Sequence, residues 1–262
     1  MPYKDEQIDL NKDKIVEEEW PTAKEQGKPW PLKAAAALVL IAFLSLALGS
    51  FLQVFNPPSF QILLESRQLN KDPLVRELHK AVVEIRVTRR SGGSGELKGT
   101  GFNIRSEGLI VTNRHLVEDA VLVSILFPGQ GTFRAENWRS SPAADLAVVS
   151  LAANQDLPVV ALEEIIPKVG EKVFIIGNPL SFLKVAMSGE VENHRMMGIP
   201  EAPLLEIKAP IQQGNSGSPV FNGDGKVVAV VFATIEGIDG DKPRGLALPV
   251  ALLEPLLKEG TP

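Results

Sequence analysis

Short apolar runs separated by glycine, proline, asparagine or aspartate dominate the chain beyond residue 80. Runs of this length, with turn-forming residues at their ends, predict β-strands rather than helices. Nine strands are expected, at Val82 to Val87, Gly101 to Ile104, Leu109 to Thr112, Val121 to Leu126, Leu146 to Leu151, Lys172 to Ile176, Val185 to Val191, Leu204 to Ile207 and Val227 to Ala233. So many short strands indicate an all-β domain, built as barrels or as a sandwich.

Smaller elements are expected around these strands. Asp72 and Pro73 form a helix start signal ahead of the first strand. The stretch from Pro249 to Leu257 is expected to close the domain as a helix. Asn222 to Gly225 predicts a hairpin turn rather than a calcium-binding loop.

A second apolar pattern lies ahead of the strands. Ala34 to Phe55 contains no charged side chain, and its 22 residues would extend about 33 Å as a helix. Because a hydrocarbon core is roughly 30 Å thick, this stretch predicts a single transmembrane helix. A buried core helix is disfavoured, since the stretch is apolar on every side. A cleaved signal peptide is the competing interpretation: Ala47 and Gly49 suit a cleavage site, but the 33 preceding residues exceed an ordinary leader segment.

Charge distinguishes the other N-terminal segments. Residues 1–33 hold six lysines and eight acidic residues with few apolar ones, which is typical of a disordered tail. Four lysines shortly before the apolar stretch outnumber two basic residues after it, and this bias places the tail in the cytoplasm. The expected order is therefore a cytoplasmic tail at 1–33, a membrane span at 34–55, a linker at 56–75 and a folded, extracytoplasmic domain at 76–262.

Composition excludes several kinds of chemistry. The 262 residues carry a formal net charge of -5 without a basic stripe, so nucleic acid is not an expected partner. Cysteine is absent, which rules out disulfides, a thiol nucleophile and a cysteine metal site. The zinc-binding pattern HExxH is also absent, so neither a metal nor a cofactor is expected.

The most specific pattern is the run GNSGSP from Gly214 to Pro219. Its glycines allow a tight turn around Ser216, so that backbone N–H groups can face a developing oxyanion. Upstream, His115 follows an apolar strand at the start of a short helix, and Asp145 opens another apolar strand. A carboxylate in such surroundings needs a donor, and an imidazole N–H is the donor that nucleophilic catalysis requires.

Each of these residues also has an ordinary explanation when it is taken alone. A serine among glycines usually marks a turn, a histidine is usually solvated or packed, and an aspartate before a strand is usually a cap. Taken together, in the order His115, Asp145, Ser216, they predict a serine nucleophile with its base and orienting acid.

Four other titratable residues are weaker candidates. His79 is expected in a solvated position on the helix before the first strand, and His194 in a surface loop near the cleft. Glu118 and Asp119 follow His115 closely but are expected to face water. None of them is assigned a role in the chemistry.

These segments together resemble the trypsin-like serine proteases of bacteria, above all the HtrA/Deg branch. The resemblance covers about residues 76–258, and its blocks are collinear with those of the family. They are GTGFNI at 99–104, IVTNRH at 110–115, DLAVVSL at 145–151, IIGNP at 175–179, GNSGSP at 214–219 and GLALP at 245–249. The form GNSGSPVFN is also similar to the glutamyl endopeptidases, and Ser218 stands where the HtrA branch usually has a second glycine.

The resemblance implies a fold and a mechanism. The fold is a pair of six-stranded antiparallel β-barrels packed at a cleft, followed by a C-terminal helix. His115 and Asp145 would come from the first barrel and Ser216 from the second. The activity would be that of a serine endopeptidase that cleaves proteins or peptides through an acyl-enzyme, with the N–H groups of Gly214 and Ser216 as oxyanion donors.

The resemblance also implies where a substrate would bind. An extended substrate is expected to pair with one strand, along Val230, Val231, Phe232 and Ala233. Pro210 lies at the floor of the first pocket, where an acidic residue would favour Lys or Arg, and Val231 takes the place of the histidine of glutamyl endopeptidases. Cleavage after small or aliphatic residues is therefore expected.

Two alternatives belong to other classes of protein. One is a catalytically idle protease fold that serves as a binding module tethered to the membrane. The other is an α/β-hydrolase esterase, which is disfavoured because its GxSxG motif would need glycine at Ser218 and a Ser, Asp, His order. By analogy with HtrA relatives a homo-oligomer is possible, whereas a C-terminal PDZ domain has no room. The expected location is the bacterial cell membrane, with one span and the protease domain outside the cytoplasm.

Overall fold

The computed structural model describes residues 30–54, 57–90, 96–152, 156–178, 185–196, 203–212, 214–235 and 244–258. The predicted tail at 1–33 lies outside this part of the chain except for its last four residues. Contacts divide the molecule into two compact units, residues 1–55 and residues 56–262, and each unit is described by itself.

The first unit is represented by the helix α1 (Trp30–Val54), 25 residues long. The predicted span from Ala34 to Phe55 falls on this helix, apart from Phe55, which lies outside the described residues. In the described part of the chain, no helix meets both the length and the hydropathy that crossing a membrane requires.

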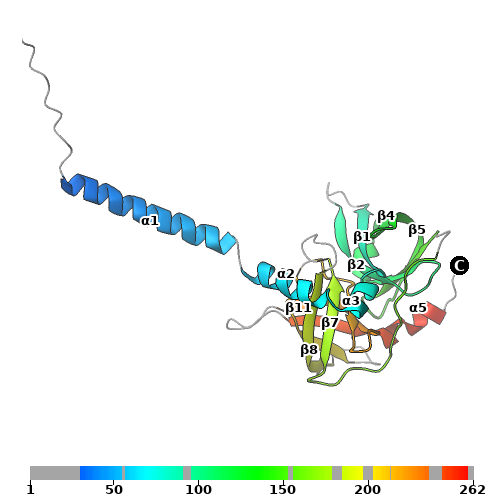
Figure 1. The fold of residues 1–262 in the computed structure, drawn as a ribbon. Coiled ribbons are helices and arrows are strands. Elements are labelled where there is room, and N and C mark those ends of the chain that lie inside the picture. Colours follow the sequence, from blue (N-terminus) through cyan, green and yellow to red (C-terminus); the bar gives the residue numbers. More distant parts are fainter. Residues whose placement is uncertain are drawn as a thin grey trace, which may run out of the picture. The chain divides into compact units, whose positions relative to one another are not determined.

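The second unit contains two closed six-stranded antiparallel barrels (Figure 1). The strands of the first barrel are, in spatial order, β1 (Val82–Arg89), β2 (Leu97–Asn103), β3 (Leu109–Thr112), β6 (Ala147–Leu151), β5 (Gly131–Ser140) and β4 (Ala120–Phe127). Those of the second barrel are β10 (Pro219–Phe221), β11 (Val227–Ile235), β12 (Arg244–Pro249), β9 (Leu204–Lys208), β8 (Val185–Arg195) and β7 (Lys172–Gly177). Two barrels, rather than a sandwich, are therefore confirmed.

All nine predicted strands are present, with their ends shifted by up to four residues. The hydrophobic pattern did not predict three further strands, β5, β10 and β12. Most residues of β5 are exposed, so it lacks an apolar run, and β10 has only three residues. The predicted turn between β10 and β11 is confirmed, because Oδ1 of Asn222 accepts the backbone N–H groups of Asp224 and Lys226.

Helices lie before, within and after the barrels. They are α2 (Pro57–Leu69), α3 (Pro73–Leu78), α4 (Arg114–Val117), the 3₁₀ turn η2 (Val250–Leu253) and α5 (Glu254–Lys258). The Asp72 carboxylate caps α3 by accepting the N–H of Leu74 at 2.8 Å. The solvated position predicted for His79 is wrong. His79 is buried, because it follows Val75 by four residues and so shares the face of α3 that packs on the domain.

The predicted linker contains α2, which lies against the start of β8 (Figure 1). Pairing with β9 begins only at Glu190, so the first residues of β8 use other acceptors along that edge. The Ser66 hydroxyl accepts the N–H of Ala186 and the Glu65 carboxylate accepts that of Ser188, both at 3.0 Å. The helix therefore satisfies amides that an open strand edge would leave unpaired.

Three clusters of buried apolar side chains form the core of the domain. One cluster fills each barrel, around Ile125 in the first and Val191 in the second. The third joins the barrels, with Phe102 and Leu146 from one and Phe221 and Leu204 from the other. This shared core holds the two barrels together.

Candidate active site

His115 and Asp145 form a hydrogen-bonded pair at the edge of the first barrel. Oδ2 of Asp145 lies 2.6 Å from Nδ1 of His115, and Oδ1 accepts the backbone N–H of the same histidine at 2.9 Å. The carboxylate thus contacts both the ring and the main chain of one residue. A carboxylate at Nδ1 keeps the proton on that nitrogen and leaves Nε2 free to accept another.

Local structure explains why these two residues meet. Asn113 caps α4, and its side-chain amide donates to the carbonyl oxygen of Asp145 at 2.9 Å. On the other side, the Ser141 hydroxyl accepts the N–H groups of Ala143 and Ala144. Both ends of the Asp145 loop are therefore fixed before β6 begins. The predicted placement of His115 at the start of a short helix is confirmed.

Ser216 lies on a tight loop between β9 and β10 and is partly exposed. Gly214 and Gly217 have φ values of 97° and 83°, a region that favours glycine. The N–H of Gly217 donates to Val231 at 2.8 Å, and that of Ser218 donates to Asn215 at 2.9 Å. Within the described residues, the N–H groups of Gly214 and Ser216 have no protein acceptor, and no hydrogen bond joins the Ser216 hydroxyl to His115.

Two of the weaker candidates, Glu118 and His194, contact other residues. Glu118 binds Arg114 at 2.7 Å, and this hydrogen bond raises the pKa of Arg114 above its usual range. His194 lies within β8 rather than in the predicted loop, and its Nε2 is 2.8 Å from the carbonyl oxygen of Pro167. Because it is a residue of a strand, its ring lies beside Pro167, in the segment that connects the two barrels, and not in a loop. Among the described residues, no group of three His, Asp or Glu side chains could hold a metal ion.

Part of the predicted substrate strand is already paired with other strands and loops of the domain. Val230 pairs with Pro219 on one side and with Leu248 on the other. The backbone of Val231 is bonded to the loop that carries Ser216, and the side chains of both valines are buried. These two residues therefore offer no free edge. In the described strands, β11 beyond Val231 pairs with β12 alone, so its other edge has no strand partner from Phe232 onward.

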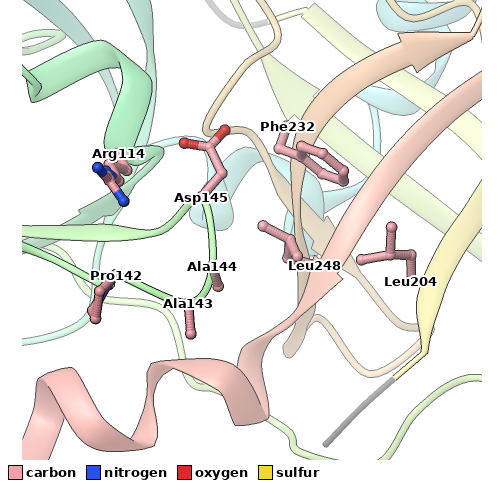
Figure 2. Close-up of a pocket in the computed structure, with 8 residues that line it drawn as sticks. All are labelled: Arg114, Pro142, Ala143, Ala144, Asp145, Leu204, Phe232 and Leu248. Atoms are coloured by element: carbon pink, nitrogen blue, oxygen red, sulfur yellow. The ribbon is translucent and has the colours of Figure 1, made fainter. Parts of the chain in front are cut away.

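A pocket of about 290 Å³ lies beside Asp145, between the two barrels. Its lining is mainly apolar and consists of Arg114, Pro142, Ala143, Ala144, Asp145, Leu204, Phe232 and Leu248. Figure 2 shows the Asp145 carboxylate between Arg114 on one side and the Phe232 ring on the other. The pocket therefore places apolar surface next to the candidate acid.

The predicted pocket floor, Pro210, is half-buried, and its neighbour Ile211 was not singled out from the sequence. Ile211 packs closely on β12, because a Cβ atom on Gly245 would come within 2.0 Å of its Cδ1. The glycine in the GLALP block was the signal that could have indicated this contact. The side chains at this predicted floor, Pro210 and Ile211, are thus both apolar.

Comparisons with known proteins show to which family the chain belongs. The sequence profile of the trypsin-like peptidase domain matches residues 99–230. Serine protease HTRA2, mitochondrial, of Bos taurus is 32% identical over 168 residues, covering 60% of this chain and 37% of that protein. A probable periplasmic DegP-like serine endoprotease of Pseudomonas fulva is 30% identical over 188 residues, covering 69% and 39%. The crystal structure of the active form of Rv3671c protease from M. tuberculosis superposes with a TM-score of 0.63 and 26% identity, covering 72% of this chain and 85% of that one.

The matched profile spans half of the chain and includes His115, Asp145 and Ser216. The chain therefore belongs to the family of proteins with a trypsin-like peptidase domain. It spans about two fifths of the length of the two curated relatives named above.

Proposed function

We propose that this protein is a serine endopeptidase whose catalytic residues are His115, Asp145 and Ser216. The observation that carries the proposal is that the Asp145 carboxylate forms hydrogen bonds with both the ring Nδ1 and the backbone N–H of His115. The loop at Ser216 supports it, because the N–H groups of Gly214 and Ser216 are without protein acceptors in the described residues. Such N–H groups suit an oxyanion that appears only during the reaction.

The mechanism follows from these positions. The Ser216 oxygen attacks a peptide carbonyl carbon while its proton passes to Nε2 of His115. Asp145 holds the imidazolium that forms, and the Gly214 and Ser216 N–H groups hold the negative oxygen. The amine then leaves with the proton from Nε2, which produces an acyl-enzyme. Water, deprotonated by His115, hydrolyses the acyl group and restores the serine.

We propose that substrates bind as extended or unfolded segments along β11 from Phe232 onward. The apolar pocket beside Asp145 and the apolar floor near Pro210 favour cleavage after small or aliphatic residues. A charged side chain at the floor would find no opposite charge at Pro210 or at Val231. Profiling with a peptide library checks this preference, and dominant cleavage after Arg, Lys or Glu would contradict it.

The decisive comparison is between the full-length chain and its Ser216→Ala variant, with an unfolded protein as substrate and a fluorophosphonate probe as a second readout. We expect the wild type to degrade the substrate and to bind one probe per chain, and the variant to do neither. Ser140→Ala, at an exposed position of β5, is the matched control and should retain both. Proteolysis that survives in Ser216→Ala would remove Ser216 from the mechanism.

A second candidate function is an idle protease fold that binds partners without cleaving them. The observation in its favour is the lack of a hydrogen bond between Ser216 and His115 in the described contacts. The same fluorophosphonate experiment separates the two functions, because an idle module would form no Ser216-dependent adduct.

We further propose that the chain is anchored in a bacterial cell membrane through residues 34–55, with its protease domain outside the cytoplasm. The support is the uncharged stretch of 22 residues and the excess of lysines ahead of it. Alkaline extraction of membranes tests the anchor, and protease accessibility in spheroplasts tests the orientation. Release of the full-length chain by alkali would contradict anchoring.

A further inference from the structure

Thr100, on β2 of the first barrel, contacts the loop of the second barrel that carries Ser216. The side chain of Thr100 is fully buried. Its backbone N–H donates to the carbonyl oxygen of Ser216 at 2.9 Å, and its hydroxyl donates to the carbonyl oxygen of Gly214 at 2.8 Å. One residue therefore binds the loop on both sides of Asn215.

Asn178, which follows β7, determines where the Thr100 hydroxyl points. Its backbone N–H and its side-chain amide lie 3.1 Å and 3.3 Å from Oγ1 of Thr100, and both are donors. The same side-chain amide donates to the carbonyl oxygen of Val83 at 3.1 Å. A hydroxyl has one proton and two acceptor sites. Because Asn178 fills the acceptor sites, the single proton of Thr100 is left for Gly214.

The loop also lies directly on the Thr100 backbone. A Cβ atom placed on Gly217 would come within 2.0 Å of the Thr100 carbonyl oxygen. That oxygen already accepts the hydroxyl of Thr112 at 2.8 Å. The loop and β2 therefore have no space between them at this point, and the loop cannot move toward the first barrel.

Along the loop, peptide groups that are hydrogen-bonded at both ends alternate with peptide groups whose N–H has no acceptor among the described residues. The peptide group between Gly214 and Asn215 is bonded at both ends, to Thr100 and to Gln212. The peptide group between Ser216 and Gly217 is also bonded at both ends, to Thr100 and to Val231. The Ser216 N–H belongs to the peptide group between these two, and the Gly214 N–H to the peptide group ahead of them. Neither N–H has an acceptor in the described residues. Since peptide groups are planar, the fixed planes on both sides of the Ser216 N–H, and the fixed plane that follows the Gly214 N–H, restrict how these two N–H groups can turn.

We propose that Thr100 is a positioning residue for the oxyanion donors, and that Asn178 directs its hydroxyl to Gly214. The inference rests on the proposed function of the Ser216 loop and assigns this network its specific part in it. Loss of the hydroxyl leaves the peptide group after Gly214 bonded at one end only, through the Asn215 N–H, and so loosens the adjacent Gly214 N–H. The oxyanion exists only in the transition state, so the loss falls on kcat and leaves KM nearly unchanged.

The test compares Thr100→Val, which keeps the shape of the side chain, with Thr100→Ser, which keeps the hydroxyl, both in the full-length chain. We expect Thr100→Val to lower kcat by ~10-fold or more with little change in KM, and Thr100→Ser to stay close to the wild type. Hydrogen exchange supplies a readout that does not depend on activity. The amides of residues 214–218 should exchange faster in Thr100→Val than in Thr100→Ser.

Thr112→Val is the matched control, because Thr112 is equally buried and its hydroxyl bond has the same length of 2.8 Å but ends on Thr100 rather than on the loop. It should lose stability as Thr100→Val does, yet lose less kcat. If Thr100→Val folds poorly, Asn178→Asp replaces it, since an acceptor in place of the amide draws the Thr100 proton away from Gly214.

Several results would overturn the inference: an unchanged kcat and exchange in Thr100→Val, an equal loss in Thr100→Ser, or an equal kcat loss in Thr112→Val. A wild-type chain without Ser216-dependent turnover would instead refute the proposed function. In that event the exchange of residues 214–218 still decides whether Thr100 orders the loop.

Discussion

At the scale of single residues, two residues of the site each bind one segment of the chain at two points. Asp145 divides its two oxygens between the ring and the main chain of His115, so rotation of the carboxylate would break both bonds. Thr100 divides its amide and its hydroxyl between two carbonyl oxygens of the Ser216 loop in the same way. Such bidentate contacts fix orientation better than single bonds.

Asp145→Asn tests the residue scale. The amide oxygen can still accept the His115 backbone N–H, which turns the NH₂ group toward Nδ1. The ring must then carry its proton on Nε2, where it cannot accept the serine proton. We expect kcat to fall by about 10⁴-fold, the size seen for the corresponding change in another protease of this type, while the unfolding midpoint changes little.

Steady-state kinetics on a peptide substrate provides the measurement for this variant. Asp119→Asn is the matched control, because Asp119 follows α4, the helix that carries His115. Its φ of 62° lies in a backbone region that suits asparagine well. Its kcat should stay at the wild-type value. Equal activity of the two variants would exclude Asp145 from the mechanism.

At the scale of elements, loops and strands of the two barrels interlock. The Ser216 loop is bonded to β2 of the first barrel and to β11 of its own barrel. Glycine is required at Gly217 for two reasons: its φ is positive, and a Cβ atom there would come within 2.0 Å of the Thr100 carbonyl oxygen. The position of Ser216 is thus determined by contacts with both barrels.

Gly217→Ala tests this joint against a control with the same backbone strain. Gly170 has a φ of 86°, nearly the value at Gly217, but a Cβ atom there would meet nothing within 4 Å. We expect Gly170→Ala to cost about 1 to 2 kcal/mol from backbone strain alone. Gly217→Ala should cost clearly more and should also reduce kcat, because the loop must move away from β2. Urea unfolding and kinetics give both quantities, and similar losses in the two variants would contradict the close contact.

At the scale of the whole domain, the cluster shared by the barrels makes them one cooperative unit. Phe221 is fully buried in it and stacks on Phe174 with the ring centroids 5.0 Å apart. A domain whose halves share a core is expected to unfold in one step, since neither half buries its surface alone.

Phe221→Ala tests this cooperativity. Removing a buried phenylalanine typically costs about 3 to 5 kcal/mol. Because the cluster spans both barrels, hydrogen exchange by global unfolding should accelerate equally in β1 of the first barrel and in β11 of the second. Acceleration confined to β11 would show instead that the barrels unfold independently.

Part of this picture could be predicted from the sequence because it depends on neighbouring residues. The apolar runs identified nine strands, and Asp72 with Pro73 identified the start of α3. The glycines around Ser216 indicated the tight turn that positive φ values require. The polar strand β5 was missed, since its stability comes from pairing with β4 and β6 rather than from its own composition.

The amino-acid sequence by itself determined the strand-rich domain, the family resemblance, and the three residues in the order His115, Asp145, Ser216. Only the tertiary structure decided the order of the strands in each closed barrel, the burial of His79 and the contacts of Thr100 with the Ser216 loop. The physical reason is distance along the chain. A turn or a cap is encoded within a few residues, whereas the bond from Thr100 to Gly214 joins positions 114 residues apart and exists only after both barrels have packed.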